Sequence, residues 1–219
     1  MYHFVMEPKL LNENIVLKKQ GLVTDNISGE NVSDLLVPII DNAQPIINKF
    51  PQILIVTFPN EQFGVTIQNE TVVISNDPQP DNPKRDKLVK SAIKLNDKFQ
   101  ENLTAYGVNF RYTVENSTLS NVQGLLDSGK LVTLGAVEDA EQTKLLSLSY
   151  IENNSNSKVQ VMINIIPSSD GSSTGVVEFI INFHQDISGN VSLPNFTALK
   201  RQVVEYETKA TAKIRSILG

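Results

Sequence analysis

The chain has 219 residues, a net charge of −5 and no cysteine, and 40% of its residues are hydrophobic. This hydrophobic content is ordinary for a folded chain that buries a core, so it argues against a disordered protein. The absence of cysteine excludes disulfides, thiolate nucleophiles and sulfur-based metal sites.

The 19 basic residues are interleaved with 24 acidic residues. Nucleic-acid affinity comes mainly from clustered basic side chains that neutralise phosphates, so this pattern disfavours DNA and RNA as partners. The sequence also lacks a signal-peptide pattern at its start and a run of ~18 apolar residues that could span a membrane. We therefore expect a cytoplasmic protein that binds neither nucleic acid nor membrane.

The first half of the chain predicts strands where apolar residues alternate or run continuously, at residues 13–19, 52–58, 62–68 and 71–75. Apolar residues at helical spacing cover residues 32–50, but Pro38 and Pro45 interrupt them, so we expect a kinked or two-piece helix there. A second helix is expected from Pro83 through the region of Leu103, with a C-terminal cap at Gly107.

The second half predicts a similar order of elements. Strands are expected at residues 108–114, 145–151, 158–166 and 175–184. A short helix is expected after Ser117 or Thr118, an additional strand over residues 131–137, and a long helix over residues 199–217.

These elements predict an α+β fold of antiparallel β-meanders flanked by helices. Both halves have the order βαβββα, which suggests two tandem units, residues 1–107 and 108–219, in a pseudo-twofold arrangement. A single continuous antiparallel sheet flanked by helices is one way in which the two units could be arranged, so that they would form one domain. The suggestion rests on the order of elements and not on residue identity between the halves.

Few residues are suited to catalysis. His184 and Asp186 share a strand face, so the carboxylate could orient the imidazole for acid–base chemistry, but a turn follows at once and we interpret the pair as a solvated strand end. The acidic run around Glu138 lacks the pattern of a calcium loop. Residues 167–175 are small and polar but lead into a strand, so we interpret them as a hairpin and not as a phosphate loop. We expect no metal and no cofactor.

These observations favour a non-enzymatic protein that binds another protein or a second copy of itself, through sheet edges or the groove between the two units. Two alternatives remain open. A small-molecule sensor would use an aromatic-lined cavity between sheet and helices, formed by Phe63, Phe110, Tyr112, Phe179 and Phe183. A carboxylate-dependent hydrolase would need two acidic side chains that face one cleft.

Overall fold

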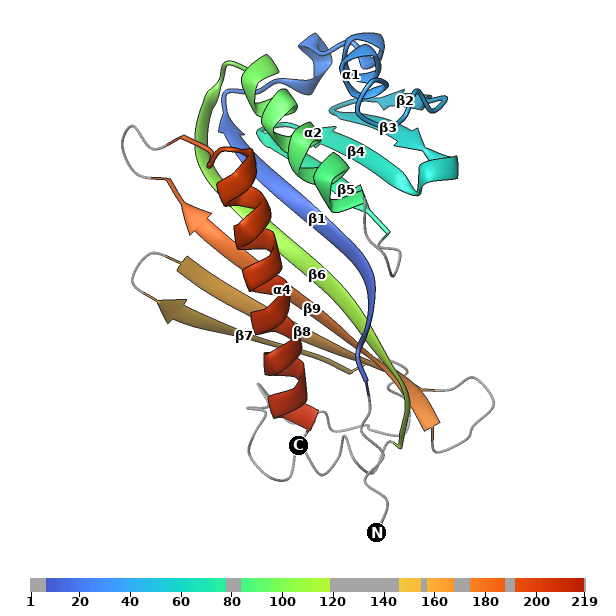
Figure 1. Ribbon diagram of the computed structural model, residues 1–219, viewed down its shortest axis with the longest axis vertical. Helices are drawn as coiled ribbons and strands as arrows, with labels where there is room; N and C mark the ends of the chain where they lie inside the picture. Colours follow the sequence, from blue (N-terminus) through green and yellow to red (C-terminus); the bar gives the residue numbers. More distant parts are fainter. Residues whose placement is uncertain are drawn as a thin grey trace.

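One antiparallel sheet organises the chain (Figure 1). The computed structural model describes residues 7–77, 84–118, 146–154, 157–167, 174–187 and 192–218. In these residues nine strands lie in the order β2-β3-β4-β5-β1-β6-β9-β8-β7, and all neighbours pair antiparallel. The strands are β1 Lys9–Gln20, β2 Ile46–Phe50, β3 Ile53–Phe58, β4 Phe63–Gln68, β5 Thr71–Asn76, β6 Asn102–Thr118, β7 Leu146–Asn154, β8 Ser157–Pro167 and β9 Thr174–Asp186.

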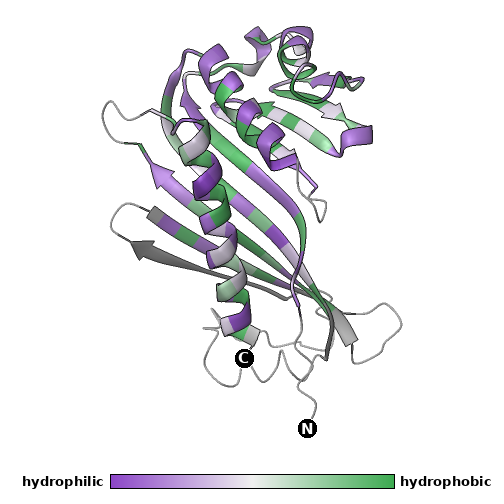
Figure 2. Cartoon of the chain, in the orientation of Figure 1, coloured by the Kyte–Doolittle hydropathy of each residue, from purple (hydrophilic) through white to green (hydrophobic). Residues whose placement is uncertain are grey.

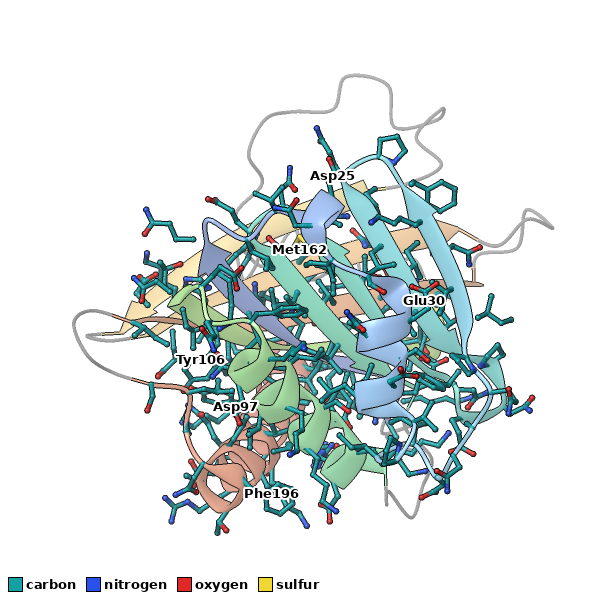
Figure 3. All side chains as sticks on the ribbon, turned by 90° about the horizontal axis from the view of Figure 1, so that it is seen from above. Asp25, Glu30, Asp97, Tyr106, Met162 and Phe196 are labelled. Carbon is teal, nitrogen blue, oxygen red and sulfur yellow. The ribbon has the colours of Figure 1, made fainter. Side chains whose placement is uncertain are left out.

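The α-helices of the described residues, α1 (Gly29–Leu36), α2 (Lys84–Lys98) and α4 (Phe196–Leu218), lie on one face of this sheet. Figure 1 shows α2 and α4 in front of the strands and α1 next to β2 and β3. In Figure 3, Phe196 is labelled beside α4 and Met162 is labelled among the strands, away from that helix. No helix in the described ranges combines the length and apolar character that a membrane crossing requires.

Strand alternation explains why the core forms on one face. Along β1, Ile15 and Leu17 are fully buried, whereas the neighbouring Asn14 and Lys18 remain partly or fully accessible. Figure 2 shows the same alternation of hydrophobic and hydrophilic residues along the central strands. Because successive side chains of a strand point to opposite faces, this pattern places the apolar side chains beneath the helices. Buried side chains from both halves of the chain form one hydrophobic cluster there.

The face away from the helices, called the open face below, is polar at its centre. Asn14, Asn109 and Asn182 lie opposite one another on β1, β6 and β9. Asn109 Nδ2 donates a hydrogen bond to Asn14 Oδ1 at 2.7 Å. Directly opposed residues on one face of a sheet contact each other, so these amides form a polar row across the middle of the open face.

The first strand of each half lies at the centre of the sheet, where β1 pairs with β6. The last strand before α2, β5, flanks β1, and the last strand before α4, β9, flanks β6. The predicted boundary between residues 107 and 108 lies inside β6, and the sheet continues through it. The expectation of an α+β fold with antiparallel strands and flanking helices is confirmed.

The helix expected over residues 32–50 is wrong beyond Leu36. α1 ends at Leu36, and residues Ile46–Phe50 form β2, in register with β3. Pro38 and Pro45 cannot donate the hydrogen bonds that a continuing helix needs, and pairing with β3 gives the backbone of residues 46–50 its partners. Four strands therefore follow α1, where three were expected.

The second helix also ends earlier than expected, at Lys98. Lys19, which is 2% exposed, places its ammonium at the end of α2. Its Nζ donates hydrogen bonds to carbonyl oxygens of Asn96 at 3.0 Å, Phe99 at 2.5 Å and Glu101 at 3.1 Å. A cation at this position satisfies terminal carbonyls and interacts favourably with the helix dipole. Burial lowers the pKa of Lys19. The negative charges of Glu101 and Asp97 act in the opposite direction and raise it, but burial has the larger effect.

Gly107 belongs to β6 and does not cap a helix. A Cβ atom at this position would come within 3.1 Å of Asn182 Oδ1 and 3.2 Å of the carbonyl oxygen of Phe183. The glycine therefore permits the close approach of β9 to β6. The short helix expected after Thr118, the strand over residues 131–137 and the acidic run around Glu138 lie outside the described residues.

A buried ion-pair cluster joins β1, α2 and α4. Arg85 donates to Glu13 Oε2 from Nε at 3.0 Å and from Nη2 at 2.5 Å, and to Glu207 Oε2 from Nη1 at 3.0 Å. The side chain of Glu13 is 0% exposed and that of Arg85 is 10% exposed. Burial by itself lowers the pKa of Arg85, but the hydrogen bonds and charges of Glu13 and Glu207 outweigh it and raise the pKa overall.

We predict that Arg85→Met lowers the free energy of unfolding by about 3 to 5 kcal/mol, because it leaves the Glu13 carboxylate buried without its cation. The double variant Glu13→Leu with Arg85→Met removes both charges and should recover most of this loss. Urea unfolding measures both. Lys200→Met breaks the exposed Lys200–Asp86 pair and serves as the control, with a loss below about 1 kcal/mol. Equal losses in the single and double variants would contradict this account.

Candidate interaction site at the edge of the sheet

β2 is an edge strand, because in the described sheet it has β3 as its single neighbour. A tight turn at residues 51–52 joins the two strands, with Phe50 opposite Ile53. Residues that flank a two-residue turn exchange hydrogen bonds across the hairpin, and the direction of these bonds alternates along the strand. The backbone N–H and C=O groups of Ile47 and Lys49 are therefore directed outward from the edge.

Large apolar side chains are exposed along this edge. The side chain of Ile46 is 51% exposed and that of Phe50 is 53% exposed. Both lie on the open face, next to the half-buried Ile53 and Ile55 of β3, which lie opposite Phe50 and Asn48. We call Ile46, Phe50, Ile53 and Ile55 the edge patch. Contiguous exposed apolar side chains of this kind mark interaction surfaces.

Lys49 does not protect this edge with its charge. Its Nζ donates hydrogen bonds to the carbonyl oxygens of Asp25 at 3.2 Å and Ile27 at 3.0 Å, at the short helix η1 (Thr24–Asn26). Edge strands often carry lysines that discourage pairing with another chain. Here the ammonium is held on the face opposite the edge patch, so the patch itself is uncharged.

α1 supports β2 from the helix side. Ser28 caps this helix by accepting a hydrogen bond from the backbone N–H of Asn31 at 3.3 Å. A Cβ atom on Gly29, the first residue of α1, would overlap Ile47 Cγ2 and come within 3.1 Å of Leu54 Cδ1. The helix therefore lies directly on β2 and β3 and supports the edge strand from the helix side.

The aromatic residues predicted to line a cavity are buried in the core between sheet and helices. The exposed fractions of their residues are at most 5%: Phe63 4%, Phe110 0%, Tyr112 2%, Phe179 0% and Phe183 5%. Phe183 stacks on Tyr206 of α4 with ring centroids 4.4 Å apart, and packs edge-on against Phe110 at 6.2 Å. These contacts fix the long helix on the sheet.

Two surface pockets lie elsewhere, and none of these five aromatic residues is among their lining residues. One, of about 300 Å³, follows the flank of α4 and is lined by Glu207, Thr208, Thr211, Ala212 and Arg215. The other, of about 220 Å³, lies between the start of α1 and the end of α2 and includes Asn26, Asn31, Phe99 and Glu101.

His184 and Asp186 form a surface pair at the end of β9, with 2.8 Å between Nε2 and Oδ1. Lys158 on β8 contacts the other carboxylate oxygen at 3.0 Å. The hydrogen bond from His184, and then that from Lys158, holds the pKa of Asp186 below its usual value. The side chain of Asp186 is 61% exposed, so this ion pair lies at the solvated strand end that the sequence predicted.

Residues 171–175 read Gly-Ser-Ser-Thr-Gly, which matches the spacing of a nucleophile elbow. An elbow connects a strand to a helix, whereas here β8 ends at Pro167 and β9 begins at Thr174, and the two strands pair antiparallel. Residues 168–173, most of the segment that we interpret as a hairpin from the sequence, lie outside the described residues.

In the described residues two pairs of acidic side chains each share a cation: Asp41 and Glu61 bind Lys87, and Glu13 and Glu207 bind Arg85. The hydrogen bonds of Arg85 occupy one carboxylate oxygen of each, and Glu13 is sealed from solvent, so the pair does not face a cleft. Among the described residues, no three His, Asp or Glu side chains converge on a point that could hold a metal ion.

Sequence reasoning missed the edge patch, because residues 46–50 were assigned to a helix. A signal was present: the apolar residues of "IINKF" lie between Pro45 and Pro51. Proline is tolerated at the ends of edge strands and not inside helices, so two prolines that bracket five residues favour a short edge strand.

We predict that Tyr112→Phe reduces the loss of stability at alkaline pH. Burial raises the pKa of Tyr112 to about 12, from 10.0. The neutral phenol therefore stabilises the fold fully below pH 10.0, and this contribution, on the order of 2 to 3 kcal/mol, is lost as pH rises through about 12 because the unfolded chain releases its proton first. Burial also raises the pKa of Tyr106 and Tyr206, so the slope should shrink and not vanish. Unfolding curves across this window measure the slope, and an unchanged slope in the variant would refute the assignment.

No protein-family model matches the chain, and no curated protein matches it significantly.

Proposed function

We propose that the protein is a non-enzymatic, cytoplasmic protein-binding module that receives an extended segment of its partner at the β2 edge. The observation that carries this proposal is the exposure of Ile46 and Phe50 on an edge strand. The lysine of this strand, Lys49, is hydrogen-bonded on the other face of the sheet. An extended segment can add to such an edge through backbone hydrogen bonds. No additional binding cavity is needed.

The chemistry of the preferred segment follows from the strand itself. Backbone groups of Ile47 and Lys49 supply outward donors and acceptors, which any extended segment can pair with. Side chains of the segment that lie on the open face would meet Ile46, Asn48 and Phe50 in turn. We therefore expect a segment with apolar side chains four residues apart and a small polar residue midway between them.

The strand order supports a further part of the proposal, that the two halves are pseudo-twofold units. In each half the first strand lies at the centre of the sheet, the last strand flanks it, and a helix follows on the same face. An axis between β1 and β6 would relate the units, and β2 would be an addition to the first one.

Peptide-display selection on the immobilised full chain tests this function. We predict that selected peptides carry apolar side chains four residues apart with a small polar residue midway between them. Ile46→Lys or Phe50→Glu should weaken their binding by at least about tenfold, because a lone charge then lies in the apolar contact. Val204→Glu is the matched control, since Val204 is 43% exposed on α4, and it should leave binding unchanged. Peptides that bind the Phe50→Glu variant as tightly as the native chain would place the site elsewhere and overturn the proposal.

A further inference from the structure

We infer that the segment received at this edge is β2 of a second copy, paired antiparallel about a twofold axis that passes beside Asn48. This inference rests on the proposed function and names its partner. The motivating observation is that β2 itself carries the pattern that its edge prefers, with apolar Ile46 and Phe50 four residues apart and polar Asn48 between them.

The register follows from symmetry. A twofold axis beside Asn48 places Asn48 opposite its own copy, and places Ile46 opposite Phe50 of the other chain, twice. All of these side chains lie on the open face, because directly opposed residues of an antiparallel pair share a face. Each of the two half-exposed side chains would thus cover the other. An isologous contact needs this kind of self-complementary patch.

The backbone agrees with the same register. The outward backbone N–H and C=O groups of Ile47 lie opposite those of Lys49 in the other copy. Each such pair of residues therefore exchanges two hydrogen bonds. The strand ends also match, because Pro45 lies opposite Pro51 of the other copy. Neither proline has an N–H group, so the pairing stops after five residues on each chain and loses no donor within them.

The shape of the assembly follows from the axis. A twofold axis perpendicular to the sheet keeps the helices of both copies on one side, and it extends the sheet across the junction. Strands of five residues are only about 17 Å long, so the contact is small compared with that of a permanent dimer. We therefore expect reversible association with a Kd of roughly micromolar order.

Sedimentation velocity over a concentration series from about 1 μM to about 1 mM tests association and its register. Ile46→Lys alone places lysine opposite phenylalanine twice, and Phe50→Glu alone places glutamate opposite isoleucine twice, so each should weaken association by at least about tenfold. An equimolar mixture of the two variants creates one Lys–Glu pair and retains one Phe–Ile pair. The mixture should associate more tightly than either variant alone, and Val204→Glu should match the native chain.

A cysteine placed on the axis gives an independent measurement. The native chain has no cysteine. Residue 48 and its copy form a non-hydrogen-bonded pair, with Cα atoms about 4.5 Å apart, which falls in the range that a disulfide spans. Asn48→Cys should therefore form a covalent dimer under mild oxidation at low micromolar concentration, and Val204→Cys, on the helix side, should not.

The outcomes separate this inference from the function on which it rests. A chain that stays monomeric throughout the series, with no Asn48→Cys cross-link, overturns the pairing with a second copy, whereas display peptides that depend on Phe50 would still support binding at the edge. If Ile46→Lys and Phe50→Glu leave the association constant unchanged, the pairing through β2 is overturned. Rescue in the mixture together with the Asn48→Cys cross-link supports both the partner and the register.

Discussion

The pairing of β1 with β6 holds the molecule together. These strands lie in register from Lys9 opposite Thr113 to Gln20 opposite Asn102, with shifts near Asn12 and Lys19. The ladder is the junction between the strands of the first half and those of the second half. It brings Phe110 and Leu17 beneath the same helices, so that one core covers both halves. The helices can pack as a single layer because this ladder makes the two groups of strands one surface.

A buried cluster of charged side chains connects the helices to β1, one of the two strands at this junction. Glu13 on β1 and Arg85 on α2 are both removed from solvent, and Glu207 of α4 completes the cluster. A buried pair of this kind contributes little net stability compared with apolar residues, but each charge is costly without its partner. The cluster therefore fixes where α2 and α4 lie on the central strands, at the position where the two halves of the chain meet.

In the described residues the helices cover one face of the sheet, so the open face and the β2 edge are left without a covering helix. The centre of the open face is a row of amides, in which Asn109 donates a hydrogen bond to Asn14. At β2, the edge strand of the sheet, the open face carries the exposed apolar side chains of Ile46 and Phe50. An apolar surface that coincides with outward backbone groups combines side-chain contact with strand addition. This coincidence, and not a cavity, is the reason that we propose a binding site at the edge.

The sequence by itself determined the fold class and most elements, because period-two alternation and period-3.6 spacing are local properties of the chain. It therefore predicted β3 to β5, the core of β6 and the long helix α4. The tertiary structure alone decided that residues 46–50 pair with β3, that Lys19 ends α2 and that Arg85 meets Glu13. Each of these depends on a partner many residues away, which local spacing does not encode. The candidate site has the same origin, since Ile46 and Phe50 become an exposed edge only when the strand order of the whole sheet is set.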